Sequence, residues 1–134
     1  MHMLYNDHIS KNDKILIKQV EQIQHLNISS VISLLFFLIM IVLVAPYLEE
    51  LLFRGIFKET LFKKSAFLLP MITSSIIFSL LHASTHWISF LMYMTVGSCL
   101  YMVYNRRKNI KDSIMVHILN NSIAVISMMF MIFT

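Results

Sequence analysis

Three long stretches of this chain carry no formal charge, and they restrict the possible folds more than any other feature of the sequence. They cover residues 27–48, 65–105 and 113–134. A helix needs about 20 apolar residues to cross the hydrocarbon core of a bilayer. The first and last stretches are long enough for one crossing each, and the middle one for two. Because backbone groups in hydrocarbon must be paired within a helix or a closed barrel, four spanning helices are expected.

The composition supports a membrane protein. Charged residues make up 13% of the chain, against about 25% in a typical soluble domain. Alternating apolar and polar residues, which mark the strands of a membrane barrel, are absent from the sequence. The predicted fold class is therefore all-α, a polytopic transmembrane helical bundle that crosses the cell membrane several times within one core domain, residues 28–134. About four spans are predicted, at residues 28–48, 66–82, 87–104 and 113–134.

Residues 1–27 form an N-terminal amphipathic segment ahead of this core. Apolar residues recur there at near-helical spacing and lysines lie opposite them: Leu16, Val20 and Ile23 against Lys11, Lys14 and Lys18. A helix with this pattern favours the membrane interface, where its apolar side meets lipid. We therefore expect an interfacial helix, and a helix that docks a partner is the alternative.

Several polar residues lie inside or beside the predicted spans. A charged side chain at the centre of a bilayer costs about 2.5–3.5 kcal/mol on insertion scales, and such residues usually face a bundle interior or a wet cavity. Each taken alone has a structural explanation, such as an ion pair, a helix cap or an interhelical hydrogen bond. Their spread over three spans favours a functional site. The set comprises Glu49, Glu50, Arg54, His82, His117 and Asn121.

Helical spacing separates the roles of these residues. Glu50 and Arg54 are four apart, so they share a helix face and are expected to form an ion pair. Glu49 is rotated by about 100° from Glu50, which leaves it the less easily neutralised carboxylate. His117 and Asn121 are also four apart and point the same way. A carboxylate together with histidines can activate water by general-base catalysis. His86, in the predicted turn, is expected at the level of the lipid headgroups.

Three motifs in this set resemble those of a known protease family. The sequence reads "EELLFR" at 49–54, "FSLLH" at 78–82 and "HILNN" at 117–121. These are similar to the EExxxR, FxxxH and HxxxN/D motifs of the CAAX protease and bacteriocin-processing (CPBP, or Abi) family of intramembrane glutamic endopeptidases. All three occur in order, each on its own predicted span. The resemblance covers roughly residues 45–130.

The resemblance implies a role for each matching residue. Glu49 and His82 would activate the attacking water, His117 and Asn121 would stabilise the oxyanion, and Glu50 with Arg54 would shape the site. The implied activity is hydrolysis of a peptide bond in a membrane-associated peptide or protein, in bacteriocin self-immunity or peptide maturation. Expected substrates include a bacteriocin or pheromone precursor. Because members of the family usually have more spans, a homodimer or a partner membrane protein is expected to close the cavity.

Two other functions remain compatible with the same residues. A non-catalytic immunity protein could bind a peptide in the same cavity, and a small transporter could use the polar set as a proton or ion relay. Glu49, His82 and His117 could also supply three ligands to a catalytic zinc ion. Because the H-E-x-x-H spacing of zinc proteases is absent, a metal-free mechanism with no cofactor is favoured.

The basic residues predict the orientation of the bundle. They lie mainly in two short loops rather than along a groove, which indicates a topology signal and contact with membrane lipid, not nucleic-acid binding. By the positive-inside rule both loops, and the opening of the cavity, are expected on the cytoplasmic side. The loop residues are Lys58, Lys63 and Lys64 after the first span, and Arg106, Arg107, Lys108 and Lys111 between the third and fourth.

Overall fold

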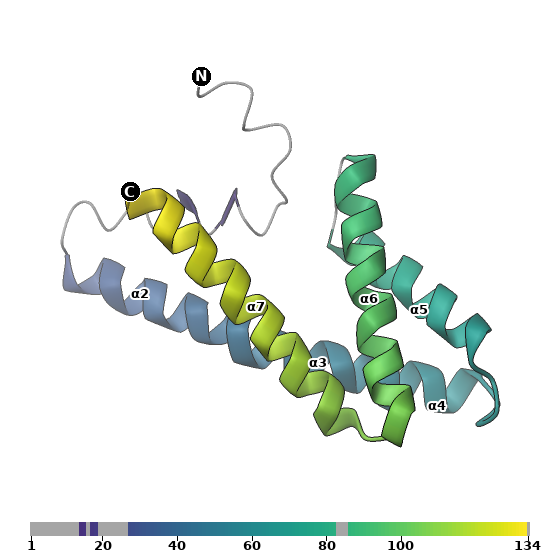
Figure 1. Ribbon diagram of the computed structural model, residues 1–134. Coiled ribbons are helices and arrows are strands. Elements are labelled where there is room, and N and C mark those ends of the chain that lie inside the picture. Colours follow the sequence, from purple (N-terminus) through teal and green to yellow (C-terminus); the bar gives the residue numbers. More distant parts are fainter. Residues whose placement is uncertain (1–13, 16, 19–26, 83–85, 134) are drawn as a thin grey trace.

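A computed structural model describes residues 14–15, 17–18, 27–82 and 86–133 of the chain (Figure 1). Every regular element within the part beginning at residue 27 is a helix, so the predicted all-α class is confirmed. The interfacial helix predicted for residues 1–27 lies almost entirely outside the described residues.

One long helical segment, Ile28–Leu61, contains the whole first predicted span and continues through the EELLFR motif. Two π-helical stretches interrupt its α-helical geometry without ending it. Three further helices follow, and α6 and α7 are also long and apolar enough to cross a membrane. The elements are α2 (Ile28–Ile39), π-helix η2 (Met40–Val44), α3 (Ala45–Glu50), π-helix η3 (Leu51–Phe57), α4 (Lys58–Leu61), α5 (Leu68–Leu81), α6 (Trp87–Arg107) and α7 (Ile110–Phe133).

The second predicted span is shorter than expected. Residues 65–67 are uncharged but not helical, and α5 has 14 residues. At 1.5 Å per residue it is about 21 Å long, less than the roughly 30 Å of a hydrocarbon core. It starts after the turn that follows α4 (Figure 1). Its C-cap residue, His82, has its Nε2 atom 3.8 Å from Glu49 Oε2. The short length therefore places His82 at the depth of the first span's glutamates.

Small residues allow α5 and α6 to pack closely. Gly97 of α6 faces Ser75 of α5, and a Cβ atom on Gly97 would lie 3.1 Å from the Cα atom of Ser75. Ser98 Oγ donates to Ser75 Oγ at 3.1 Å, and Ser79 Oγ donates to the Phe90 carbonyl at 2.6 Å. Small residues and hydroxyl hydrogen bonds are the usual means by which membrane helices approach one another.

Two apolar clusters hold the rest of the bundle together. Phe53 of η3, Phe78 of α5 and Leu100 of α6 form the first, so the α5–α6 pair packs against the long helix. Helix α7 runs back along α2 and α3, with Leu34 buried against α7 (Figure 1). Many large apolar side chains, such as Phe36 and Ile126, remain exposed. A water-soluble monomer rarely presents so extensive an apolar surface. This surface is instead suited to contact with lipid.

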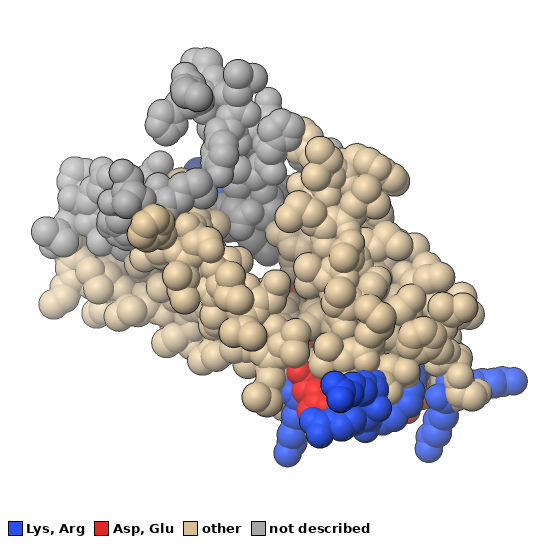
Figure 2. Space-filling model, viewed as in Figure 1, with Lys and Arg blue, Asp and Glu red and all other residues tan. Residues whose placement is uncertain are grey.

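The two basic loops lie at the same end of the molecule. Lys64, after α4, and Lys108, after α6, line one pocket. Figure 2 shows lysine and arginine side chains gathered at this end, while the remainder of the visible described surface carries little charge. The predicted arrangement of both loops on one side of the bundle is therefore present in the structure, and the cytoplasmic assignment stays a prediction.

Single cysteines at Lys64 and Lys108, in a Cys99→Ser background, should resist an impermeant thiol reagent in intact cells. The reason is the positive-inside rule, which retains loops rich in lysine and arginine in the cytoplasm. Labelling after the cells are opened serves as the control for accessibility. Labelling of both positions from outside would reverse the topology.

Replacing Gly97 by valine should destabilise the bundle. The new side chain would have to displace the backbone of α5 at Ser75, and overpacking of this kind typically costs about 1–3 kcal/mol. Thermal unfolding of the purified protein in detergent measures the effect. Thr95→Val, on an exposed part of the same helix, is the matched control, and an equal loss in both variants would argue against a close helix contact at Gly97.

Candidate active site

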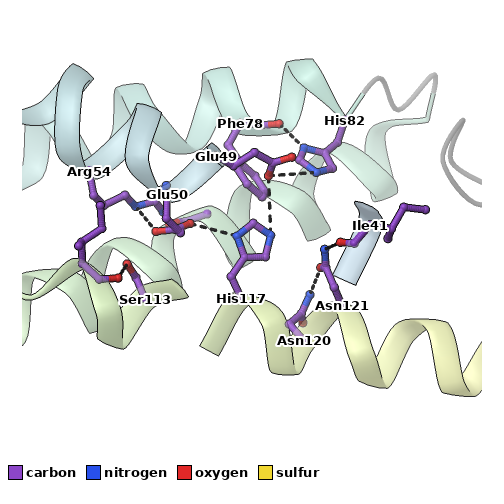
Figure 3. Close-up of polar contacts among 12 residues, drawn as sticks. Ile41, Glu49, Glu50, Arg54, Phe78, His82, Ser113, His117, Asn120 and Asn121 are labelled. Carbon is purple, nitrogen blue, oxygen red and sulfur yellow. Dashed lines mark hydrogen bonds and ion pairs between the residues drawn. The ribbon is translucent and has the colours of Figure 1, made fainter. Parts of the chain in front are cut away.

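A buried network of charged and polar groups lies between α3, η3, α6 and α7 (Figure 3). The Glu50 carboxylate is 0% exposed and contacts two partners. Its Oε2 lies 3.1 Å from Arg54 Nε, as the four-residue spacing predicts, and its Oε1 lies 3.1 Å from His117 Nδ1. Arg54 Nη2 donates to the Gly97 carbonyl at 2.8 Å. Glu50 therefore links Arg54 to His117 and fixes the ring of that histidine.

Glu49, the residue before Glu50 on the same helix, faces His82 and His117. Its side chain is 29% exposed, and its Oε2 atom is buried without a hydrogen-bond partner among the described residues. The Nε2 atom of His82 lies 3.8 Å from Glu49 Oε2, and the Nε2 atom of His117 lies 3.7 Å from it. These distances exceed a direct hydrogen bond of about 2.7–3.2 Å and match polar groups bridged by a water molecule.

The partners of the two imidazole rings determine where their hydrogens lie. His82 Nδ1 is 2.8 Å from the Phe78 carbonyl, which only accepts hydrogen bonds, so this nitrogen carries the hydrogen. His117 Nδ1 faces the Glu50 carboxylate, which also accepts. In a neutral ring the opposite nitrogen is an acceptor. Both Nε2 atoms are therefore acceptors toward Glu49 as long as each ring is neutral.

Two aromatic rings hold the imidazole of His82 in place. The ring of Phe78 stacks on the His82 imidazole with the two centroids 4.3 Å apart. The ring of Tyr93 in α6 also stacks on this imidazole, with the two centroids 4.6 Å apart. The FxxxH motif anticipates Phe78, because residues four apart share a helix face. Tyr93 was missed by the sequence analysis. Its one signal is an aromatic residue with a polar tip in the middle of a predicted span.

Asn121 is anchored through a carbonyl that Pro46 leaves without a partner. In η2 the Ala45 N–H donates to the Met40 carbonyl, five residues back. The same spacing would pair the Ile41 carbonyl with the nitrogen of Pro46, which carries no hydrogen. Asn121 Nδ2 donates to Ile41 O at 3.0 Å instead. The helix thus accommodates Pro46 by a widened π-helical turn, and Asn121 of α7 satisfies the carbonyl that this turn exposes.

A cavity of about 100 Å³ adjoins these residues. His82, His117 and Asn121 contribute its polar wall, and Ile41 and Val96 are among its apolar lining. The structure therefore brings together the predicted residues from three separate motifs. Glu49 does not line the cavity, but its carboxylate faces both histidines (Figure 3). His86 lies apart in the chain, immediately before α6.

The described residues contain no group of three or more His, Cys, Asp or Glu side chains arranged to hold a metal ion. Glu49, His82 and His117 do meet, but the histidine nitrogens lie 3.8 and 3.7 Å from the carboxylate oxygen. Ligands of one tetrahedral zinc ion, each about 2.0–2.1 Å from the metal, lie about 3.3–3.4 Å apart, so these groups are a few tenths of an ångström farther apart than a shared zinc ion requires.

A family model described as "Type II CAAX prenyl endopeptidase Rce1-like" matches residues 31–123. The chain belongs to this family. The matched segment includes all three motifs, so the resemblance to the CPBP proteases is confirmed. Membership in this family of membrane CAAX-type proteases, together with the three helices long enough to span a bilayer, makes the chain a membrane protein.

Three curated bacterial proteins are similar to the chain. "Putative membrane peptidase YdiL" of Bacillus subtilis (strain 168) is 34% identical over 63% of this chain and 34% of its own length. "UPF0177 protein YbdI" and "UPF0177 protein YxdF" of Lactococcus lactis subsp. lactis (strain IL1403) are 35% and 38% identical over 61% and 56% of this chain, and 43% and 40% of their own lengths. The matched region thus spans less than half of each relative. No solved structure matches the chain.

Replacing Arg54 by methionine should destabilise the bundle by about 3–5 kcal/mol, because it leaves the buried Glu50 carboxylate without its cationic partner. The double variant Glu50→Gln/Arg54→Met should recover part of this loss. Chemical unfolding in detergent provides the measurement. Arg107→Met is the matched control, since Arg107 pairs with Asp112 at 2.9 Å with its side chain 69% exposed and such surface pairs contribute about 0–1 kcal/mol. Equal losses for Arg54→Met and Arg107→Met would contradict the buried network.

Proposed function

We propose that this protein is an intramembrane endopeptidase that hydrolyses a peptide bond in a membrane-associated peptide or protein. The observation that supports it most directly is the meeting of Glu49 Oε2 with the Nε2 atoms of His82 and His117 at 3.8 and 3.7 Å. These separations suit a water molecule held between the carboxylate and an imidazole. Family membership supports the same reaction class.

The proposed mechanism gives the two histidines different hydrogen-bonding roles. A water molecule donates two hydrogen bonds, whereas Glu49 Oε2 and two neutral rings would present three acceptors to it. If His117 carries a second proton, its Nε2 becomes a donor and the count balances. Glu49 and Glu50 together then balance the charges of Arg54 and His117, because both carboxylates lie within 4 Å of that imidazole. The water then donates to Glu49 and to His82.

Hydrolysis follows from this arrangement. Glu49, assisted by His82, takes a proton from the water as its oxygen attacks the carbonyl carbon of the substrate. The resulting oxyanion accepts hydrogen bonds from His117 Nε2 and from the Asn121 amide, whose nitrogen has a second hydrogen besides the one donated to Ile41. The C–N bond breaks as the proton held by Glu49 passes to the leaving amine. Donors held in position for an oxyanion typically lower the barrier by about 2.7–4 kcal/mol each.

The proposed setting is a bacterial cell membrane, where the chain crosses several times and its site opens to the cytoplasmic side. The similar curated proteins come from Bacillus subtilis and Lactococcus lactis, which supports a bacterial role. We propose that the substrates are peptides such as bacteriocin or pheromone precursors, cleaved in self-immunity or maturation. A second copy of the chain or a partner membrane protein would complete the wall of the cavity.

Glu49→Gln should reduce peptide hydrolysis by about 100- to 10,000-fold, the usual contribution of a general base. Purified protein in detergent would be assayed with quenched-fluorescent peptides of CAAX type, with and without a farnesyl group. Binding of the same peptides should persist, because the amide keeps the shape of the side chain. Asp112→Asn, which removes a carboxylate outside the site, is the matched control and should leave the rate unchanged.

Three outcomes would contradict the proposal or its mechanism. Equal hydrolysis by wild type and Glu49→Gln would end the role of Glu49 as base, and peptide binding or toxin protection without hydrolysis by wild type would favour a binding protein. Activity lost with a chelator and restored by zinc would replace the metal-free mechanism by one in which Glu49, His82 and His117 approach each other as ligands.

A further inference from the structure

A second pocket, separate from the catalytic residues Glu49 and His82, lies at the basic end of the molecule (Figure 2). It has a volume of about 580 Å³ and lies between the η3–α4 segment and the turn that joins α6 to α7. Four cationic side chains and one carboxylate contribute to its lining. They are Arg54, Lys58, Lys64, Lys108 and Glu59.

The protein's own carboxylates leave this pocket with an excess of positive charge. Glu50 pairs with Arg54 at 3.1 Å, and Glu59 accepts from Lys58 Nζ at 2.7 Å. No ion pair of Lys64 or Lys108 within 4.0 Å is found among the described residues, although the charge of Lys64 does act on the Glu59 carboxylate. Lys108 Nζ contacts the side-chain oxygen of Asn105. The Nη1 atom of Arg54 is buried without a hydrogen-bond partner in the described part of the chain. The pocket thus has four cationic side chains in its lining against the single carboxylate of Glu59, and this excess of positive charge favours an anion.

Lys58 and Lys108 are held around one tyrosine. The ring centroid of Tyr104 lies 5.8 Å from Lys58 Nζ and 6.0 Å from Lys108 Nζ, within the range of cation–π attraction. The Tyr104 hydroxyl donates to Glu59 at 2.6 Å. Lys58 is only 1% exposed, and so long a charged side chain is rarely buried without a fixed set of partners. The side chains of the pocket are therefore ordered rather than scattered over a surface.

The turn after α6 requires a left-handed backbone at position 108 but does not require a lysine there. Lys108 ends α6 with a φ of 53°, the left-handed conformation that glycine or asparagine usually adopts after a helix. For a lysine this conformation costs roughly 1–2 kcal/mol. Glycine would fit the turn without that cost but would remove the ammonium group from the pocket. Strain at a residue whose side chain lines a pocket indicates that the side chain has a use.

We propose that this pocket binds the phosphate group of an anionic phospholipid. The basic loops emerge here from helices that are apolar enough to cross a bilayer, which places the pocket at the level of lipid headgroups. Leu51 lines the pocket and is 40% exposed, and Leu52 beside it is 47% exposed, so an apolar surface for acyl chains adjoins the phosphate site. Basic pockets between membrane helices commonly hold such headgroups. The proposal is independent of peptide hydrolysis.

Binding of phosphatidylglycerol to the purified protein in detergent, followed by native mass spectrometry, tests this site. The variant Lys64→Gln/Lys108→Asn removes two charges from the pocket, and asparagine tolerates the left-handed turn. We expect it to weaken binding by about tenfold or more, because two basic groups near the phosphate are lost. The matched control Lys63→Gln/Lys111→Gln removes the same charge from neighbouring exposed positions outside the pocket and should bind almost as wild type does.

Two comparison ligands identify what the pocket recognises. Phosphatidylcholine of the same chain length should bind at least tenfold more weakly than phosphatidylglycerol, because its choline cancels the phosphate charge. Glycerol 3-phosphate should also bind more weakly, because it lacks acyl chains.

Equal losses of binding in the two double variants would mean general surface attraction, and equal binding of phosphatidylcholine would mean that charge is not recognised. Equally tight binding of glycerol 3-phosphate would identify a soluble phosphate instead. Each of these three results overturns the proposal.

The unfolding temperature without lipid separates binding from folding. Lys108→Asn relieves backbone strain, so the pocket variant should unfold at or above the temperature of wild type. Added phosphatidylglycerol should raise that temperature in wild type and in the Lys63/Lys111 control more than in the pocket variant, because a ligand stabilises only the state that binds it. An equal rise in all three proteins would contradict a lipid site at Lys64 and Lys108.

Discussion

The burial of the Glu50 carboxylate is the constraint on which the rest of the bundle depends. An ion without exposure to solvent costs several kcal/mol unless oppositely charged and hydrogen-bonding groups surround it. Arg54 provides the charge from the same helix, and His117 provides a hydrogen bond from α7. Arg54 also reaches the Gly97 carbonyl of α6. One carboxylate thus joins three segments, and it fixes the ring whose far nitrogen faces Glu49.

The close packing of α5 against α6 serves the same network. Gly97 lies against Ser75 where a side chain would not fit, and its carbonyl accepts from Arg54. Phe78, whose ring would lie 3.4 Å from a Cβ atom on Gly97, stacks on His82 together with Tyr93. The residues that determine how closely the helices approach are therefore neighbours of those that orient the candidate base. Packing and site geometry depend on the same contacts here.

The sequence was sufficient for local features of this structure and insufficient for those that depend on contacts between distant segments. Uncharged stretches predicted the helices, and the spacing of Glu50 and Arg54 predicted their ion pair, because both follow from helix geometry. The short α5 was not predicted, since residues 65–67 carry no charge but are not helical. Tyr93 stacking and the pocket between two loops were also missed, because both require knowing which helices are neighbours.

Pro46 and Asn121 are far apart in the chain but share one backbone carbonyl, that of Ile41. A residue with a backbone N–H at position 46 could compete with the Asn121 amide for that carbonyl, and an apolar residue at 121 would leave the carbonyl unsatisfied inside the membrane. Each substitution changes the consequence of the other. Among related sequences, the two positions should therefore vary as a pair, and a change at either should survive best where the other has already changed.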